Sequence, residues 1–232
     1  MSRILVTGSN NGLGATLTFV LRCKGHVVIE YDIEEDDCLD PVTPTRDVRR
    51  PCLDGLNIEP LDVLVNCAGV NKNDWLENET DEGWDRVMGV NAKGIFKMTQ
   101  ACLPHLRKTK GTVLNIISNA SHMPMRCSLA YNASKGAAHI MTLQLARELS
   151  PDITVFGISP NKLRGTRMSR VIELEVQRTR GWTSQEAEEY QAKSLLAGEE
   201  TDVPTLANFI AFLLQTKQNH KYLTGCVLPY GA

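Results

Sequence analysis

Short apolar runs alternate along the chain with longer stretches in which apolar residues recur at helical spacing. The short runs are rich in β-branched residues and almost entirely apolar, which is typical of parallel strands buried on both faces. These runs are Arg3–Thr7, His26–Asp32, Leu61–Asn66, Thr112–Ser118, Ile153–Ser159 and Cys226–Leu228. Helical spacing covers Leu13–Cys23, Asp81–Leu106, Ala130–Leu149 and Val203–Gln215. The alternation predicts an α/β fold: a doubly wound parallel sheet of about six to seven strands, with helices on both faces.

The length of the chain predicts one domain. A chain of 232 residues is long enough for a single well-buried core, so we expect residues 1–232 to form one domain. The stretch Ile33–Leu61 contains four of the ten prolines. It is therefore too short and too rich in proline for two full crossover helices.

The segment Arg164–Leu196 lies between the strand that ends at Ser159 and the last long helix. It can form one or two helices, and the family resemblance described below implies that it is a lid that closes over a bound substrate. The alternative is a static packed insert. The residues expected to face a pocket or the core are Met168, Val171, Leu174 and Leu195, together with His122, Met123 and Met125 from the segment after Ser118.

Composition excludes several classes of function. A formal net charge of -2, with 22% charged residues, argues against nucleic acid or an anionic membrane as a partner. The seven cysteines are odd in number and none are spaced as CxxC, so reduced thiols in a cytoplasmic protein fit best. No cluster of cysteine and histidine has metal-ligand spacing. No apolar run reaches transmembrane length, and the first one is too short for a signal peptide.

A glycine-rich turn, Thr7-Gly8-Ser9-Asn10-Asn11-Gly12-Leu13-Gly14, joins the first strand to the first helix. Glycines at this place let the backbone turn tightly and approach a diphosphate, which the free N–H groups and the dipole of the helix N-terminus attract. A strand precedes the turn and a helix follows it, as a dinucleotide site requires. The alternative is a tight turn without a ligand.

Asp32 lies at the end of the second strand. At this position a carboxylate can accept hydrogen bonds from both hydroxyls of an adenosine ribose, and it would repel a 2′-phosphate. Four acidic residues follow Ile33, with no lysine or arginine among them. The sequence therefore favours NAD over NADP. The alternative is that Asp32 only begins a solvated acidic loop.

Three polar residues can move a proton on and off an alcohol oxygen: Ser118, Tyr131 and Lys135. Tyr131 and Lys135 are spaced i,i+4 and so share one face of a helix. A phenol titrates near pH ~10. An ammonium about 4 Å away, at an effective dielectric near 20, would favour the phenolate by roughly 4 kcal/mol and lower its pKa by up to about 3. Tyr131 is then a candidate general acid or base, with Ser118 bonded to the same oxygen. The alternative is that all three are ordinary packing or surface residues.

These motifs, in this order, resemble those of the short-chain dehydrogenase/reductase family, whose fold is of the Rossmann type. Asn66-Cys67-Ala68-Gly69 is similar to the family's Asn-Asn-Ala-Gly, and Tyr222-Leu223-Thr224-Gly225 to the motif before its last strand. The resemblance implies that Asn91 completes a catalytic tetrad with Ser118, Tyr131 and Lys135, and that Lys135 binds the nicotinamide ribose. It implies cofactor contacts at Gly8, Asn10, Asn11, Gly12, Leu13, Gly14, Asp32, Ile33, Asp47, Val48, Asn66, Ala68, Gly69, Tyr131, Lys135, Pro160 and Thr166.

The chain departs from the family pattern after the strand that ends at Ser159. Where the family has Pro-Gly, this chain has Pro160-Asn161, and Thr166, the counterpart of the threonine that holds the nicotinamide carboxamide, comes one residue later. Asparagine tolerates a positive φ better than most residues. We therefore expect the turn to survive.

The resemblance and the residues together predict an NAD-dependent oxidoreductase that interconverts a secondary alcohol and its ketone. Two alternatives stay open: an epimerase or dehydratase on the same scaffold that uses bound NAD, and a non-catalytic dinucleotide sensor. The family resemblance also implies a homodimer or homotetramer built on the Asp81–Leu106 and Ala130–Leu149 helices.

Overall fold

The computed structural model describes residues 1–33, 46–195 and 198–231. Its centre is one parallel sheet with the order β2-β1-β3-β4-β5-β6. The predicted doubly wound parallel sheet is confirmed. The strands are β1 (Arg3–Thr7), β2 (Val27–Tyr31), β3 (Val63–Asn66), β4 (Thr112–Ile116), β5 (Thr154–Pro160) and β6 (Val227–Tyr230).

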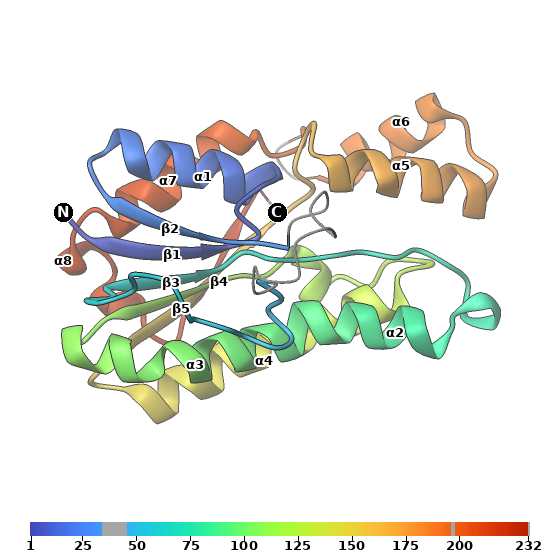
Figure 1. Cartoon of the computed structure of the whole chain (residues 1–232). Helices are drawn as coiled ribbons and strands as arrows, with labels where there is room; N and C mark the ends of the chain where they lie inside the picture. The colour runs from blue at the N-terminus through green and yellow to red at the C-terminus, as the bar shows by residue number, and fades with distance from the viewer. Residues whose placement is uncertain (34–45, 196–197, 232) are drawn as a thin grey trace.

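Helices cover both faces of the sheet (Figure 1). α1 and α7 lie on one face, and α3 and α4 lie on the other. The helices are α1 (Gly12–Cys23), α2 (Asp81–Met88), α3 (Gly94–Thr109), α4 (Leu129–Leu149), α5 (Arg167–Arg180), α6 (Ser184–Ser194), α7 (Val203–Leu214) and α8 (Lys217–His220). Shorter 3-10 turns are Leu76–Asn78, Asn119–Ser121 and Lys221–Leu223, and a π-helical turn spans Gly89–Lys93.

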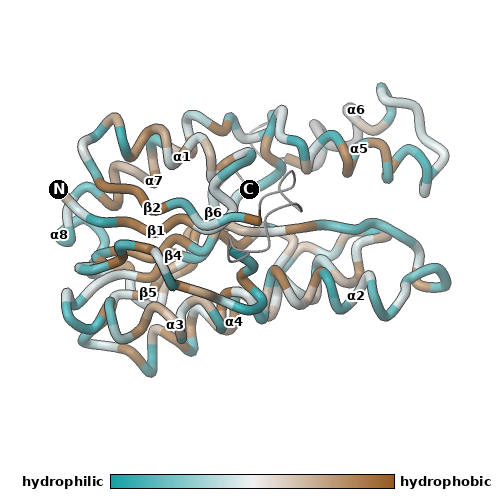
Figure 2. The backbone as a smooth tube through the Cα atoms, viewed as in Figure 1, coloured by the Kyte–Doolittle hydropathy of each residue, from teal (hydrophilic) through white to brown (hydrophobic). Residues whose placement is uncertain are grey.

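The hydrophobic core forms one layer on each side of the sheet. Figure 2 shows the apolar colour concentrated along the strands and on the inner sides of the helices. Leu17 of α1 and Ile210 of α7 are fully buried in one layer, and Met98 and Leu106 of α3 are fully buried in the other. Each such side chain contributes roughly 1.5–3 kcal/mol by leaving water. The two layers hold the carboxyl ends of the strands at one edge, where ligands of open α/β sheets bind.

The connection from β2 to β3 contains no helix or strand in its described part, residues 32–33 and 46–62. Backbone and side-chain hydrogen bonds hold it to the body instead. Arg46 donates to the carbonyl oxygens of Cys52 and Asp54 at 2.7 and 2.9 Å, and the Cys52 N–H donates to Tyr31 Oη at 3.0 Å. The irregular backbone of these residues agrees with the proline-rich sequence there.

α5 and α6 extend past the carboxyl ends of the strands and lie over the segment that joins β3 to α2 (Figure 1). The sequence predicts one or two helices in this segment, and the structure has two. None of the described helices is long and apolar enough to cross a bilayer.

Candidate active site

The four predicted catalytic residues come from three places at the carboxyl edge of the sheet. Ser118 follows β4, and Tyr131 and Lys135 lie one turn apart on α4. Asn91 lies in the π-helical turn between α2 and α3. Two of them converge on Gly69: Asn91 Oδ1 and Lys135 Nζ lie 3.5 and 3.8 Å from the place of a Cβ on that glycine.

The π-helical turn interrupts what the sequence predicts as one helix, Asp81–Leu106. Such turns insert one extra residue and are frequent at functional sites. Asn91 is fully buried there. Its Oδ1 accepts from the Val70 N–H at 2.9 Å, and its Nδ2 donates to Val70 O and to Ser134 Oγ at 2.9 and 3.0 Å. The side chain therefore fixes the segment after β3 against α4.

Ser118 is held by the 3-10 turn that follows it. Its Oγ accepts from the Ala120 N–H at 3.2 Å. Asn132, next to Tyr131 on α4, donates from Nδ2 to Ala120 O and Met123 O at 2.6 and 2.9 Å. The sequence motifs did not single out Asn132, although its place inside the Tyr-x-x-x-Lys motif puts it beside the site.

The predicted lowering of the Tyr131 pKa by Lys135 is wrong. Burial raises the pKa of Tyr131, and a hydrogen bond with Ser118 lowers it by less. Lys135 Nζ lies 5.8 Å from the centre of the Tyr131 ring and donates to Ile116 O at 3.1 Å. Burial also lowers the pKa of Lys135 to about 8.

The turn between β1 and α1 fits a diphosphate. A Cβ on Gly14 would lie 1.9 Å from Gly8 O, and one on Gly8, whose φ is +69°, would lie 2.8 Å from Ala68 Cα. At these two glycines the backbone segments therefore pack too closely for any residue that has a side chain. Asn11 precedes α1 without bonding the first N–H groups of that helix through its side chain. These N–H groups can bind an anion.

A cavity of about 290 Å³ opens beside this turn. The turn itself forms one wall, and the segment that leads into α5 forms the other. The lining residues are Asn10, Asn11, Gly12, Ala15, Thr16, Arg164, Gly165, Thr166, Arg167 and Val203. Positive side chains and the N–H groups of the helix N-terminus thus face a common space, which suits the two phosphates of a dinucleotide.

Asp32 lies against the glycine turn. Its Oδ2 accepts from the Asn10 N–H at 2.8 Å. Ile33 is exposed beside it, whereas the Leu13 side chain is buried in the core, so only the backbone of Leu13 can meet a ligand.

The segment after β3 is tied to the turn by Thr7, which the sequence motifs identified only as the start of the turn. Thr7 Oγ1 accepts from the N–H groups of Cys67 and Ala68 at 3.0 and 3.1 Å. Asn66 points into the interior, where its Nδ2 donates to Asn115 Oδ1 at 2.8 Å. Burial raises the pKa of Cys67 to about 12, so its thiol stays protonated at neutral pH.

Two of the predicted cofactor contacts, Asp47 and Val48, differ in their surroundings. Val48 is buried against α3, where a Cβ on Gly94 would lie 2.8 Å from it. Asp47 forms an ion pair with Arg49 at 2.7 Å.

The turn after β5 does not depend on the positive φ that was expected at Asn161. The φ of Asn161 is not positive. Its side chain instead binds the neighbouring segments: Oδ1 accepts from the N–H and the hydroxyl of Thr201, and Nδ2 donates to Gly231 O. Thr166 caps α5 by accepting from the Ser169 N–H at 3.0 Å, and its methyl group faces Gly12.

The prediction that Val171 and Leu174 face a pocket or the core is wrong. Val171 and Leu174 are 44% and 66% exposed, because the buried face of α5 runs through Ser169 and Val176 instead. Met168 does point inward and ends 4.0 Å from the place of a Cβ on Gly69. His122, Met123 and Met125 are largely exposed, and Leu195 is half-buried. Within the described residues no cluster of potential metal ligands occurs.

The chain matches one protein family and several known proteins. A family profile described as short chain dehydrogenase matches residues 52–177. The chain is 30% identical over 193 residues to acetoacetyl-CoA reductase from Shinella zoogloeoides, covering 76% of this chain and 80% of the relative. It is 31% identical over 188 residues to D-xylose 1-dehydrogenase from Caulobacter vibrioides, covering 72% and 74%.

A solved structure shares the fold over nearly the whole chain. It is a putative 2-deoxy-d-gluconate 3-dehydrogenase from Agrobacterium tumefaciens with bound NADP. The TM-score is 0.80 at 25% identity, and the match covers 98% of this chain and 94% of that one.

Proposed function

The chain belongs to the short-chain dehydrogenase family of oxidoreductases, and from that premise we propose that it interconverts a secondary alcohol and its ketone with NAD. One observation carries the proposal. The buried residues Asn91, Ser118 and Lys135 gather with Tyr131 at the carboxyl edge of the sheet, beside a turn that fits a diphosphate.

Each residue of this set has a proposed role. Tyr131 Oη takes the proton from the alcohol or gives it to the ketone, and Ser118 Oγ donates a hydrogen bond to the same oxygen. Lys135, whose pKa of about 8 lies close to neutral pH, exchanges a proton with the phenol group of Tyr131. When bound, the nicotinamide accepts or supplies the hydride and, in its oxidised form, brings a positive charge that favours the phenolate.

We propose that the alcohol is a small hydroxylated molecule such as a sugar or polyol. Two of the similar proteins are named for sugar substrates, although a third is named for an acyl-CoA. A panel of polyols, aldoses, hydroxy acids and β-hydroxyacyl thioesters, incubated with NAD, tests this by nicotinamide absorbance. Net reduction of NAD by a sugar or polyol supports the proposal. Product without net reduction would indicate an epimerase or dehydratase, and binding without any product would indicate a sensor.

We expect NADH to bind at least about tenfold more tightly than NADPH, because a 2′-phosphate would meet the Asp32 carboxylate beside the glycine turn. Direct fluorescence titration of both cofactors measures the ratio. Asp32→Asn should reduce the ratio of the NADH affinity to the NADPH affinity. Asp54→Asn removes the same charge from an exposed position and should leave that ratio unchanged. Tighter binding of NADPH by the unmodified protein would show that Asp32 does not reach the ribose.

We also propose a homodimer or homotetramer formed through α3 and α4. Phe96 of α3 and Leu129 and Ile140 of α4 expose 43%, 48% and 62% of their surface, so apolar area remains for a second copy. Sedimentation of the purified chain tests this assembly, and a monomer at working concentrations would contradict it.

A further inference from the structure

Asn73 lies in the segment between β3 and α2 and is only 2% exposed. Its backbone N–H and its Nδ2 both donate to the same carboxylate oxygen, Glu175 Oε2 of α5, at 3.0 and 2.9 Å. Hydrogen bonds to an ionised group that are shielded from water are among the stronger ones in proteins. This pair therefore holds the second half of α5 against the body of the molecule.

The Asn73 amide has a second partner on its other side. The Glu175 carboxylate can only accept, so the amide nitrogen faces Glu175 and the amide oxygen faces away from it. Ser128 Oγ donates to that oxygen, Asn73 Oδ1, at 2.5 Å. Ser128 is the N-cap residue of α4, three residues before Tyr131. One asparagine thus joins the catalytic helix to α5, because its amide donates to Glu175 and accepts from Ser128.

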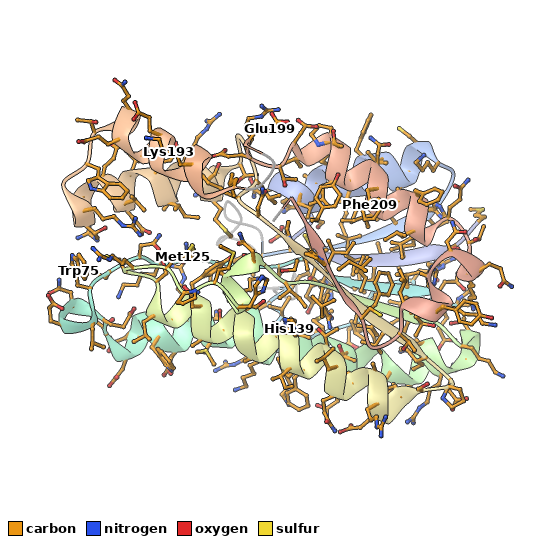
Figure 3. All side chains as sticks on the ribbon, turned by 180° about the vertical axis from the view of Figure 1, so that it is seen from behind. Trp75, Met125, His139, Lys193, Glu199 and Phe209 are labelled. Atoms are coloured by element: carbon orange, nitrogen blue, oxygen red, sulfur yellow. The ribbon has the colours of Figure 1, made fainter. Side chains whose placement is uncertain are left out.

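Residues near Asn73 and Glu175 make further contacts between the β3–α2 segment and α5. Arg178 donates to Asn73 O at 3.4 Å and pairs with Asp74 at 3.5 Å. Trp75 Nε1 donates to Thr179 O at 3.0 Å, and Figure 3 shows Trp75 on the side of the molecule that faces α5 and α6. The Arg178 side chain is 62% exposed, so its ion pair contributes little. The Asn73–Glu175 bonds are better shielded from water, since Asn73 is buried and Glu175 is half-buried.

The first turn of the same helix reaches the catalytic residues. Met168 Cε lies 4.0 Å from the place of a Cβ on Gly69, close to Asn91 Oδ1 and Lys135 Nζ. Met168 and Glu175 are two turns apart on one continuous helix, about 10 Å along its axis. Attachment at Glu175 therefore determines where Met168 lies over the site.

We propose that Asn73 is a positioning residue, which holds α5 over the catalytic residues through Glu175 while its amide oxygen accepts a hydrogen bond from Ser128. The proposal rests on the proposed function for its effect on turnover. Loss of the attachment lets α5 move away from the site, so substrate binds more weakly while the groups that move the proton stay in place.

The test uses Asn73→Asp, Glu175→Gln and the double variant, with Glu77→Gln as a control for loss of one exposed charge from the same segment. The carboxylate introduced by Asn73→Asp can still accept from Ser128, but it faces the carboxylate of Glu175. We expect trypsin to cut within α5 about tenfold faster, KM to rise about tenfold and kcat to change less than about threefold. In the double variant the amide introduced on α5 can donate to the new carboxylate, so both the cleavage rate and KM should return to within about threefold of the unmodified protein.

Cleavage by trypsin at wild-type rate in Asn73→Asp would overturn the proposal, and so would a double variant as susceptible as Asn73→Asp. Glu175→Gln keeps the shape of the side chain and weakens the bonds by removing their charge, so it gives a smaller change in the same direction even if Asn73→Asp folds poorly. Cleavage is measured without substrate. Its pattern therefore tests the attachment even if no alcohol in the panel is oxidised.

Discussion

Tyr131→Phe is expected to lower kcat by about 10²–10⁴-fold while NADH binds as before, since general acid–base catalysis contributes on that order. The change removes only the phenol oxygen. The ring stays between Ser118 and Lys135, so the packing of α4 and the diphosphate turn are not disturbed. Steady-state turnover of the substrate found in the panel, together with NADH titration, measures both effects.

The matched control is Tyr222→Phe, because Tyr222 is 79% exposed and lies on a 3-10 turn before β6. It should retain full turnover. Normal turnover in Tyr131→Phe would end the proposed mechanism. Loss of NADH binding in that variant would mean that the phenol oxygen supports the cofactor site instead of the proton transfer.

Lys135→Met is expected to make the protein without cofactor more stable while it lowers turnover by at least about 100-fold. Burial lowers the pKa of Lys135 from 10.5 to about 8. That difference corresponds to a cost of about 3 kcal/mol for holding a buried ammonium at neutral pH. The lost hydrogen bond to Ile116 O offsets about 1 kcal/mol, so we expect a net gain of about 2 kcal/mol in the free energy of unfolding.

The gain should depend on pH in a defined direction. Below about pH 8 Lys135 is protonated in both the folded and the unfolded chain, so the folded protein bears the full cost of the buried charge. Between about pH 8 and about pH 10.4 the unfolded chain binds more protons, and the stability of the unmodified protein rises with pH. The advantage of Lys135→Met should therefore shrink across this window in denaturant titrations. A constant difference would show that Lys135 is not buried as an ammonium.

Local sequence was enough to locate the strands and the glycine turn. The β-rich runs lie within about two residues of the observed strands, because a parallel strand buried on both faces must be apolar throughout. A Cβ on Gly14 would clash with Gly8 O, so this position requires glycine. The spacing of the glycines alone therefore predicts the turn. The helical spacing of Tyr131 and Lys135 likewise follows from the geometry of one helix.

Helical faces and interruptions were less predictable. Val171 and Leu174 of α5 suggested the wrong inward face, because the apolar residues of this helix are too sparse to define a stripe. The spacing of apolar residues also predicted one continuous helix over Asp81–Leu106 and so missed the π-helical turn at Asn91. In both cases packing against other elements decided the outcome.

The sequence by itself determined the sheet, the glycine turn and the placing of Tyr131 and Lys135 on one helix, because each depends on neighbours a few positions away. Only the tertiary structure decided the pKa shifts of Tyr131 and Lys135 and the contacts of Asn73. Burial, which depends on the whole fold, raises the pKa of Tyr131 and lowers that of Lys135, where the sequence predicted that the lysine would dominate. Asn73 meets Ser128 and Glu175 across 55 and 102 residues. No local pattern encodes such a contact, since it exists only when the folded chain brings three distant segments together.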